Sequence, residues 1–125
     1  SVVRTETAVG SGAQNLALFG TAALGDMWKV SNRGKMTMYA TNTTGGTTGN
    51  QTIDKPTGTV NFAAGASTLT VTNALCTTSS IVFAVVRTND TTAVIKNVVP
   101  GNGSFVITLS ATATAETSVG FMVIN

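Results

Sequence analysis

The side chains that could carry out acid–base or nucleophilic chemistry are few and scattered along the sequence. The chain has no histidine and a single cysteine, Cys76, so neither a serine nor a cysteine nucleophile has an imidazole base. The five carboxylates are not spaced as metal ligands, and no two form a local pair: Glu6, Asp26, Asp54, Asp90 and Glu116. We therefore expect no enzyme activity, no catalytic residue, no metal site and no cofactor.

The single cysteine also excludes a disulfide within the chain. Cys76 follows Ala74 and Leu75 and precedes a run of threonine and serine residues. This context is typical of a small buried hydrophobic residue rather than of a reactive thiol.

Two aromatic residues, Trp28 and Tyr39, carry a polar group and lie next to polar turns or loops. Aromatic rings of this kind bind the apolar C–H faces of sugars, while amide, carboxylate and guanidinium groups bind the sugar hydroxyls. Such polar groups are close by in the sequence: Asp26, Asn32, Arg33 and Asn42. The sequence therefore offers a glycan-binding site around Trp28 and Tyr39. The alternative is that both rings pack at the edge of the fold or between subunits.

The charge content is low for a protein of 125 residues, a length that predicts one domain. Charged residues make up 10% of the chain and the net charge is +2, whereas a typical soluble domain has about 25% charged residues. The basic residues are dispersed, so we expect no nucleic-acid partner. No stretch reaches the roughly 18 apolar residues of a membrane-spanning helix, so we expect no membrane insertion. So few charges predict that the domain is tethered to something soluble or partly covered by copies of itself.

Alternation of apolar and polar residues predicts the fold class. Short alternating runs recur along the second half of the chain, with turn-forming residues between them and no long helical patterns. The expected strands are 58–63, 67–72, 81–86, 92–99, 104–110 and 119–124. This pattern predicts an all-β antiparallel sandwich or barrel, of which we favour a jelly-roll-like β-sandwich.

Three expectations concern the packing of these strands. Residues 81–86 are apolar on both faces, which predicts a central strand covered on each side. Residues 87–91 are turn-forming and suggest a hairpin to the next strand. The phenylalanines of the strands are expected to fill the core: Phe62, Phe83, Phe105 and Phe121.

The N-terminal part is less regular. Residues 26–30 and 35–41 predict two further strands around an Asn32-Arg33-Gly34 turn, and residues 41–51 predict a long exposed loop. Residues 14–24 fit a short helix or an extended connector, and the sequence leaves both open. We divide the chain into a connector, residues 1–25, and a sandwich domain, residues 26–125.

Several stretches resemble the C-terminal domains of bacteriophage tail fibre and tailspike proteins. They are 58–67 (GTVNFAAGAS), 69–73 (LTVTN), 85–90 (VVRTND), 95–100 (IKNVVP) and 115–125 (AETSVGFMVIN). The resemblance implies a β-sandwich that caps a long homotrimeric fibre, holds its chains in register and contacts the host. Its place would be the tail fibre or tailspike tip of the virion. Its partners would be further copies of the chain and host cell-surface polysaccharide or lipopolysaccharide.

On this resemblance, residues 1–25 descend from an upstream shaft and lie at the trimer axis. No clear strand within the chain claims the apolar residues there, so they are the candidates for the three-fold contact: Val2, Val3, Leu16, Leu18 and Phe19. Two other functions stay open, namely a stand-alone monomeric carbohydrate-binding module and a capsid decoration or head-fibre domain. The oligomeric state distinguishes the fibre cap from the monomeric module.

Overall fold

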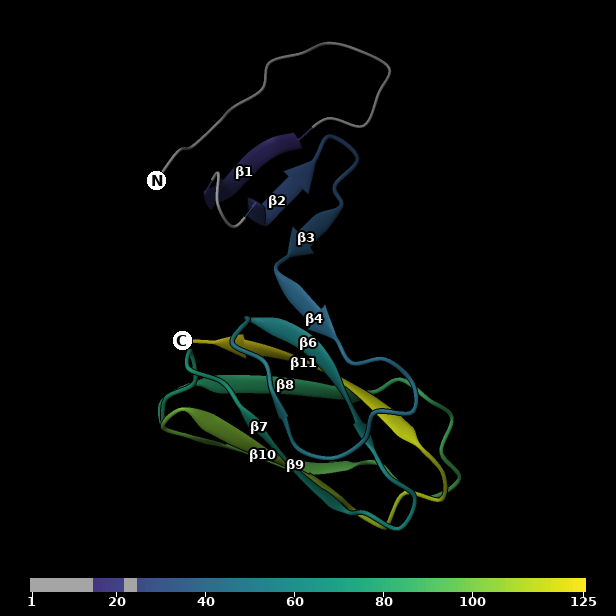
Figure 1. Cartoon of the computed structure of the whole chain (residues 1–125). Helices are drawn as coiled ribbons and strands as arrows, with labels where there is room; N and C mark the ends of the chain where they lie inside the picture. Colours follow the sequence, from purple (N-terminus) through teal and green to yellow (C-terminus); the bar gives the residue numbers. More distant parts are fainter. Residues whose placement is uncertain (1–14, 22–24) are drawn as a thin grey trace. The chain divides into compact units, whose positions relative to one another are not determined.

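The computed structural model describes residues 15–21 and 25–125, with side chains from Met27 onward (Figure 1). Its contacts divide the chain into two compact units, Ser1–Tyr39 and Ala40–Asn125. The sequence predicts a boundary after residue 25, whereas the division in the structure lies after Tyr39. The reason is that the strand beginning at Gly25 pairs with an earlier strand and not with the sandwich.

The N-terminal unit contains an antiparallel sheet of three strands: β1 (Asn15–Thr21), β2 (Gly25–Ser31) and β3 (Met36–Met38). Of the two conformations that the sequence left open, β1 adopts the extended one. The predicted turn joins β2 to β3, and its Gly34 has a φ of 76°, a conformation that residues with a side chain rarely adopt. Ser31 Oγ accepts the backbone N–H of Arg33 (3.3 Å) and of Lys35 (3.1 Å), which closes the turn.

The second unit consists of two sheets of four strands each (Figure 1). The first sheet has the order β4 (Ala40–Asn42), β6 (Thr57–Phe62), β11 (Thr117–Ile124), β8 (Ile81–Val86). The second sheet has the order β5 (Gln51–Thr52), β7 (Thr68–Thr72), β10 (Ser104–Leu109), β9 (Ile95–Gly101). The described chain is therefore all-β, as predicted, and its two facing sheets are consistent with a β-sandwich.

Both sheets of the second unit are mixed. The long strands pair antiparallel, but the short strands β4 and β5 run parallel to β6 and β7. This differs from the purely antiparallel arrangement that the sequence predicts. Among the described residues there is no helix, and so none that could cross a membrane.

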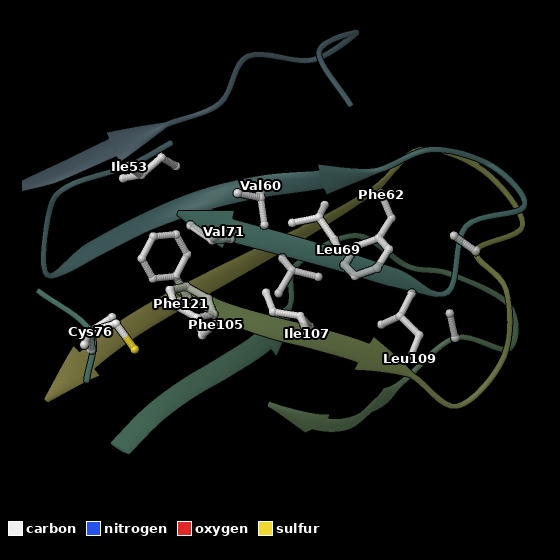
Figure 2. Close-up of a cluster of buried hydrophobic side chains, with 14 residues drawn as sticks. Ile53, Val60, Phe62, Leu69, Val71, Cys76, Phe105, Ile107, Leu109 and Phe121 are labelled. Carbon is white, nitrogen blue, oxygen red and sulfur yellow. The ribbon is translucent and has the colours of Figure 1, made fainter. Parts of the chain in front are cut away.

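The hydrophobic core lies between the two sheets, where alternate residues of the long strands meet (Figure 2). The first sheet contributes Val60, Phe62, Val119, Phe121 and Val123, and the second contributes Leu69, Val71, Phe105, Ile107 and Leu109. The rings of Phe105 and Phe121 meet across the two sheets edge to face, with centroids 5.0 Å apart. The predicted burial of Phe62, Phe105, Phe121 and Cys76 is confirmed.

Strand β8 differs from its prediction, because it is an edge strand that pairs only with β11. Its even-numbered residues pack against the core, while Ile81, Phe83 and Val85 point outward and are 60%, 56% and 62% exposed. The predictions of a central strand covered on both faces and of a core position for Phe83 are therefore wrong. The physical reason is that the described part of a two-layer sandwich holds no third layer to cover this face.

The hairpin predicted after β8 is also wrong, since residues 87–94 carry the chain from the first sheet to β9 in the second. This connection contains Asp90, whose Oδ1 accepts two backbone N–H groups of the same segment. Its Oδ2 accepts bonds from Thr114 and Thr117. A turn-forming stretch predicts a reversal of the chain, but it does not say which sheet receives the next strand.

Strand β9 forms one edge of the second sheet. It begins at Ile95 rather than at Thr92, and it continues through Pro100 to Gly101. Pro100 pairs with Phe105 of β10. A sheet edge tolerates proline because the missing N–H need not bond to a neighbouring strand.

Candidate functional site

The residues predicted to bind glycan are divided between the two units. Trp28 lies on β2 opposite Met38, and both Trp28 and Tyr39 are half-buried. Asn32 and Arg33 are exposed in the turn at the other end of the β2–β3 hairpin. Asp26 belongs to β2, with its side chain outside the described part, whereas Asn42 belongs to β4 of the second unit. Within the first unit, Asn32 and Arg33 thus lie at the turn of the hairpin, away from the Trp28–Met38 pair. The role of all six residues in binding sugar stays a prediction.

The residues predicted for the three-fold axis are partly placed. Leu16, Leu18 and Phe19 belong to β1, which pairs with β2, so the premise that no strand within the chain claims them is wrong. Val2 and Val3 lie outside the described residues. A role of these residues at a trimer axis stays a prediction.

The feature that sequence reasoning missed is an apolar surface on the outside of the first sheet. We call it the apolar face and define it by Ile81, Phe83, Val85, Met122 and Ile124. Met122 pairs with Phe83 and Ile124 with Ile81, so side chains from the two strands lie in adjacent rows. Exposed apolar groups gathered in this way usually mark a surface that another molecule covers.

A groove of about 570 Å³ overlaps the apolar face, since Phe83, Val85 and Met122 are among the residues that line it. Ala40 and Asn42 of β4 line one side, Val85 and Arg87 line the other, and β6 and β11 form the floor. Gly120 of β11 lies in this floor and has no side chain. A Cβ added there would lie 3.2 Å from Cδ of Arg87. The absence of a side chain there lets the aliphatic stem of Arg87 lie across β11.

Residues 43–50 are held against the first sheet at Thr59 and Asn61 of β6. Asn61 points outward from β6 and donates through Nδ2 to the carbonyl oxygens of Thr44 (3.0 Å) and Thr47 (3.1 Å). It is consequently only 3% exposed. The loop predicted over residues 41–51 is confirmed for residues 43–50, whereas residues 41, 42 and 51 belong to β4 and β5.

The outer surface of the second sheet has the opposite character. Its residues are Thr52, Thr68, Thr70, Thr72, Asn97, Val99, Ser104, Val106 and Thr108. We call it the hydroxyl face. Neutral hydroxyl groups are compatible with water and with a β-strand, so this surface needs no covering partner.

The carboxylates of the sandwich serve the fold. Hydrogen bonds from the N–H groups of Ala93 and Thr92, and from Thr114 and Thr117, hold the pKa of Asp90 well below its usual value. Among the described residues no three His, Cys, Asp or Glu side chains are grouped as metal ligands would be. The chemistry that this arrangement supports is association through an apolar surface.

One signal in the sequence could have revealed the apolar face. A two-layer sandwich covers one face of each sheet, so a strand that is apolar on both faces must expose one of them. Residues 81–86 are such a strand in a sequence without helical patterns to form a covering layer. No protein-family model matches the chain, and no curated protein or solved structure matches it either.

Proposed function

We propose that the chain is the C-terminal trimerisation and host-attachment domain of a bacteriophage tail fibre or tailspike, placed at the fibre tip of the virion. The observation that carries this proposal is the apolar face, which a soluble chain must cover. The resemblance to such terminal domains, which covers roughly residues 26–125, supplies the biological setting.

The occupant that we propose for the apolar face is another copy of the same chain. Full burial of one Ile, Val or Phe side chain contributes about 1.5–3 kcal/mol, and Ile81, Phe83 and Val85 are each more than half exposed. No charged residue belongs to the face, and Arg87 lies only at its margin. A copy can therefore cover it without burying an unpaired charge.

A three-fold axis suits this surface. Closed cyclic symmetry places the same face of each chain around one axis. The apolar face of every copy is then covered, and none stays exposed to solvent. The low charge content of 10% agrees with a chain that relies on tethering and on association rather than on surface charge for its solubility. Host glycan binding is then a task for the surfaces that remain exposed.

The test is the solution mass of the whole chain by light scattering on a size-exclusion column. We expect a mass three times 12.7 kDa. The matched variants are Val85→Lys on the apolar face and Val99→Lys on the hydroxyl face, because both valines lie on edge strands and are 62% and 52% exposed. Val85→Lys should give the mass of a single chain, since it places an ammonium group in the contact. Val99→Lys should stay trimeric.

Two results would contradict this proposal. A wild-type mass of 12.7 kDa would mean that no copy covers the apolar face, and would favour the monomeric carbohydrate-binding module. A trimer that survives Val85→Lys unchanged would place the contact elsewhere, with the N-terminal residues predicted for the axis as the next surface to mutate.

A further inference from the structure

The groove on the first sheet has two halves of different chemistry. The apolar half is formed by residues of the apolar face, namely Phe83, Val85 and Met122. We call the other part the polar half and define it by Asn42, Thr59, Gly120 and Arg87. Asn42 pairs with Thr59 and Thr59 pairs with Gly120, so these three residues form one row across β4, β6 and β11. Arg87 directly follows β8, and its aliphatic stem reaches this row at Gly120.

The polar half offers hydrogen-bond donors that the chain itself does not use. Arg87 and Asn42 are exposed, and within the described part of the chain neither side chain has a hydrogen-bond or ion-pair partner. Thr59 is only 5% exposed, and its Oγ1 accepts the N–H of Thr43 at 3.0 Å. A hydroxyl that accepts one hydrogen bond can still donate its own proton. The polar half therefore presents donors from three side chains to a ligand.

The charge of the polar half is positive and unbalanced. Among the described residues that line the groove, Arg87 is the one ionisable residue. The carboxylates of the described sandwich already accept hydrogen bonds from backbone N–H groups of their own chain, namely those of Asp54, Asp90 and Glu116. A neighbouring sandwich is therefore a poor source of an anion for Arg87, and a ligand that carries its own anion is the better match.

Gly120 positions Arg87 for such a ligand. A Cβ at Gly120 would lie 3.2 Å from Cδ of Arg87, so the lack of a side chain lets the stem lie against β11. A stem held in this way keeps the guanidinium at the groove and leaves less conformational entropy to lose on binding. The groove volume of about 570 Å³ lies within the range of roughly 300–1,000 Å³ that small-molecule sites have. The groove therefore has room for a sugar unit that contacts Arg87.

We infer that the polar half binds a carboxylate-bearing sugar unit of a host polysaccharide. The guanidinium of Arg87 and the carboxylate form a bidentate pair, while Asn42 and Thr59 donate to neighbouring oxygen atoms of the sugar. This inference rests on the proposed function and deepens it by naming the site and the class of glycan. In the proposed trimer the neighbouring copy covers the apolar half, and the three polar halves bind one repetitive polymer with avidity.

The experiment measures binding of the whole chain to immobilised polysaccharides at one ionic strength. Alginate and hyaluronate carry carboxylates, dextran sulfate carries sulfates, and dextran is uncharged. The wild type should bind alginate and hyaluronate and should not bind dextran. Arg87→Gln should weaken binding to both carboxylated polymers about tenfold or more, because it removes hydrogen bonds to a charged group.

Four further variants test the geometry of the site. Lys96→Gln removes the same charge from an exposed position on β9 of the second sheet, and it should bind like wild type. Arg87→Lys keeps the charge but not the planar fork of donors, and it should lose less than Arg87→Gln. Gly120→Ala keeps every donor but displaces the stem of Arg87, and it should also weaken binding. Asn42→Ala should weaken binding about fivefold, the loss of roughly one hydrogen bond.

Equal losses for Arg87→Gln and Lys96→Gln would overturn the inference, because the attraction would then depend on net charge and not on the groove. Weakening by Arg87→Gln of the binding to dextran sulfate alone would overturn it as well, since the anion would be a sulfate. Binding that is abolished by Trp28→Ala and unaffected by Arg87→Gln would also overturn it, and would assign the glycan to the N-terminal unit.

Light scattering on every variant separates this inference from the proposed function. A trimer that binds no carboxylated polymer would overturn the inference and leave the trimeric cap intact. A single-chain mass would instead count against the proposed function. Binding to alginate that Arg87→Gln weakens and Lys96→Gln does not would then still assign the carboxylate to the groove.

Discussion

The two sheets of the sandwich are alike on the inside and opposite on the outside. Strand β7 alternates threonine with Leu69 and Val71, so its outer residues are hydroxyls. Strand β8 exposes Ile81, Phe83 and Val85 instead. Both strands satisfy the same requirement for an apolar inner row. The inner row therefore gives the strand its place in the fold, and the outer row decides whether the sheet faces water or a partner.

The largest effect should come from the inner faces, where the two sheets are equivalent. Phe105→Ala in the second sheet and Phe121→Ala in the first should each lower the free energy of unfolding by about 3–5 kcal/mol, because each leaves a cavity. Chemical denaturation of both variants and of the double variant measures this. The edge-to-face contact of the two rings predicts a coupling energy of about 0.5–1.5 kcal/mol. Strictly additive losses would contradict an energetic coupling between the two rings.

A smaller effect should distinguish the loop contacts made with the two sheets. Asn61→Ala leaves the carbonyl oxygens of two loop residues without their donor on the first sheet and should destabilise by about 1–3 kcal/mol. Asn50 is exposed and its Oδ1 accepts the N–H of Thr70 at 2.8 Å on the second sheet, where water can replace the lost partner. Asn50→Ala should therefore cost about 1 kcal/mol or less. If thermal unfolding showed equal losses of stability for Asn61→Ala and Asn50→Ala, burial of Asn61 would not increase the cost of losing its hydrogen bonds.

The smallest predicted effect is the change of stability with pH that Asp90 causes near neutral pH. Asp90 lies in residues 87–94, which join the two sheets. Its pKa is lowered in the folded chain, so its contribution is complete above the unfolded pKa of about 3.9. That contribution is lost as the pH falls toward the folded pKa. The difference in melting temperature between wild type and Asp90→Ala should thus stay constant from pH 7 to about pH 5 and shrink below about pH 4. A difference that changes steadily between pH 7 and pH 5 would contradict this assignment.

The sequence predicted the strands whose two faces differ in polarity. Strands β7 and β10 each carry one mainly apolar row, and local alternation was enough to place Phe105 of β10 in the core. Strand β8 is apolar on both faces, and alternation cannot say whether the second face is covered by the same chain, by a copy or by water. Phe83 was assigned to the core for that reason.

The candidate sites were less predictable than the fold. Asn42 follows Tyr39 closely in the sequence, yet the two residues belong to different compact units. The crossing at Asp90 depends on Thr114 and Thr117, which are distant in the sequence. A single sequence shows neither a unit boundary within a polar stretch nor a hydrogen bond between distant segments. The N-terminal turn at Asn32-Arg33-Gly34 was predictable because its hydrogen bonds are local.

Pro100 has a consequence for how large an assembly of this chain can grow. An open strand edge adds further strands, and the process continues indefinitely when both edges of a molecule accept them. On β9 the proline lacks an N–H and the neighbouring Lys96 carries a charge, so this edge is a poor template. On β8 the edge from Ile81 to Val86 contains neither proline nor charge. With only one of these two edges receptive, edge-to-edge pairing ends once that edge is occupied, so copies should not polymerise into filaments through these strands.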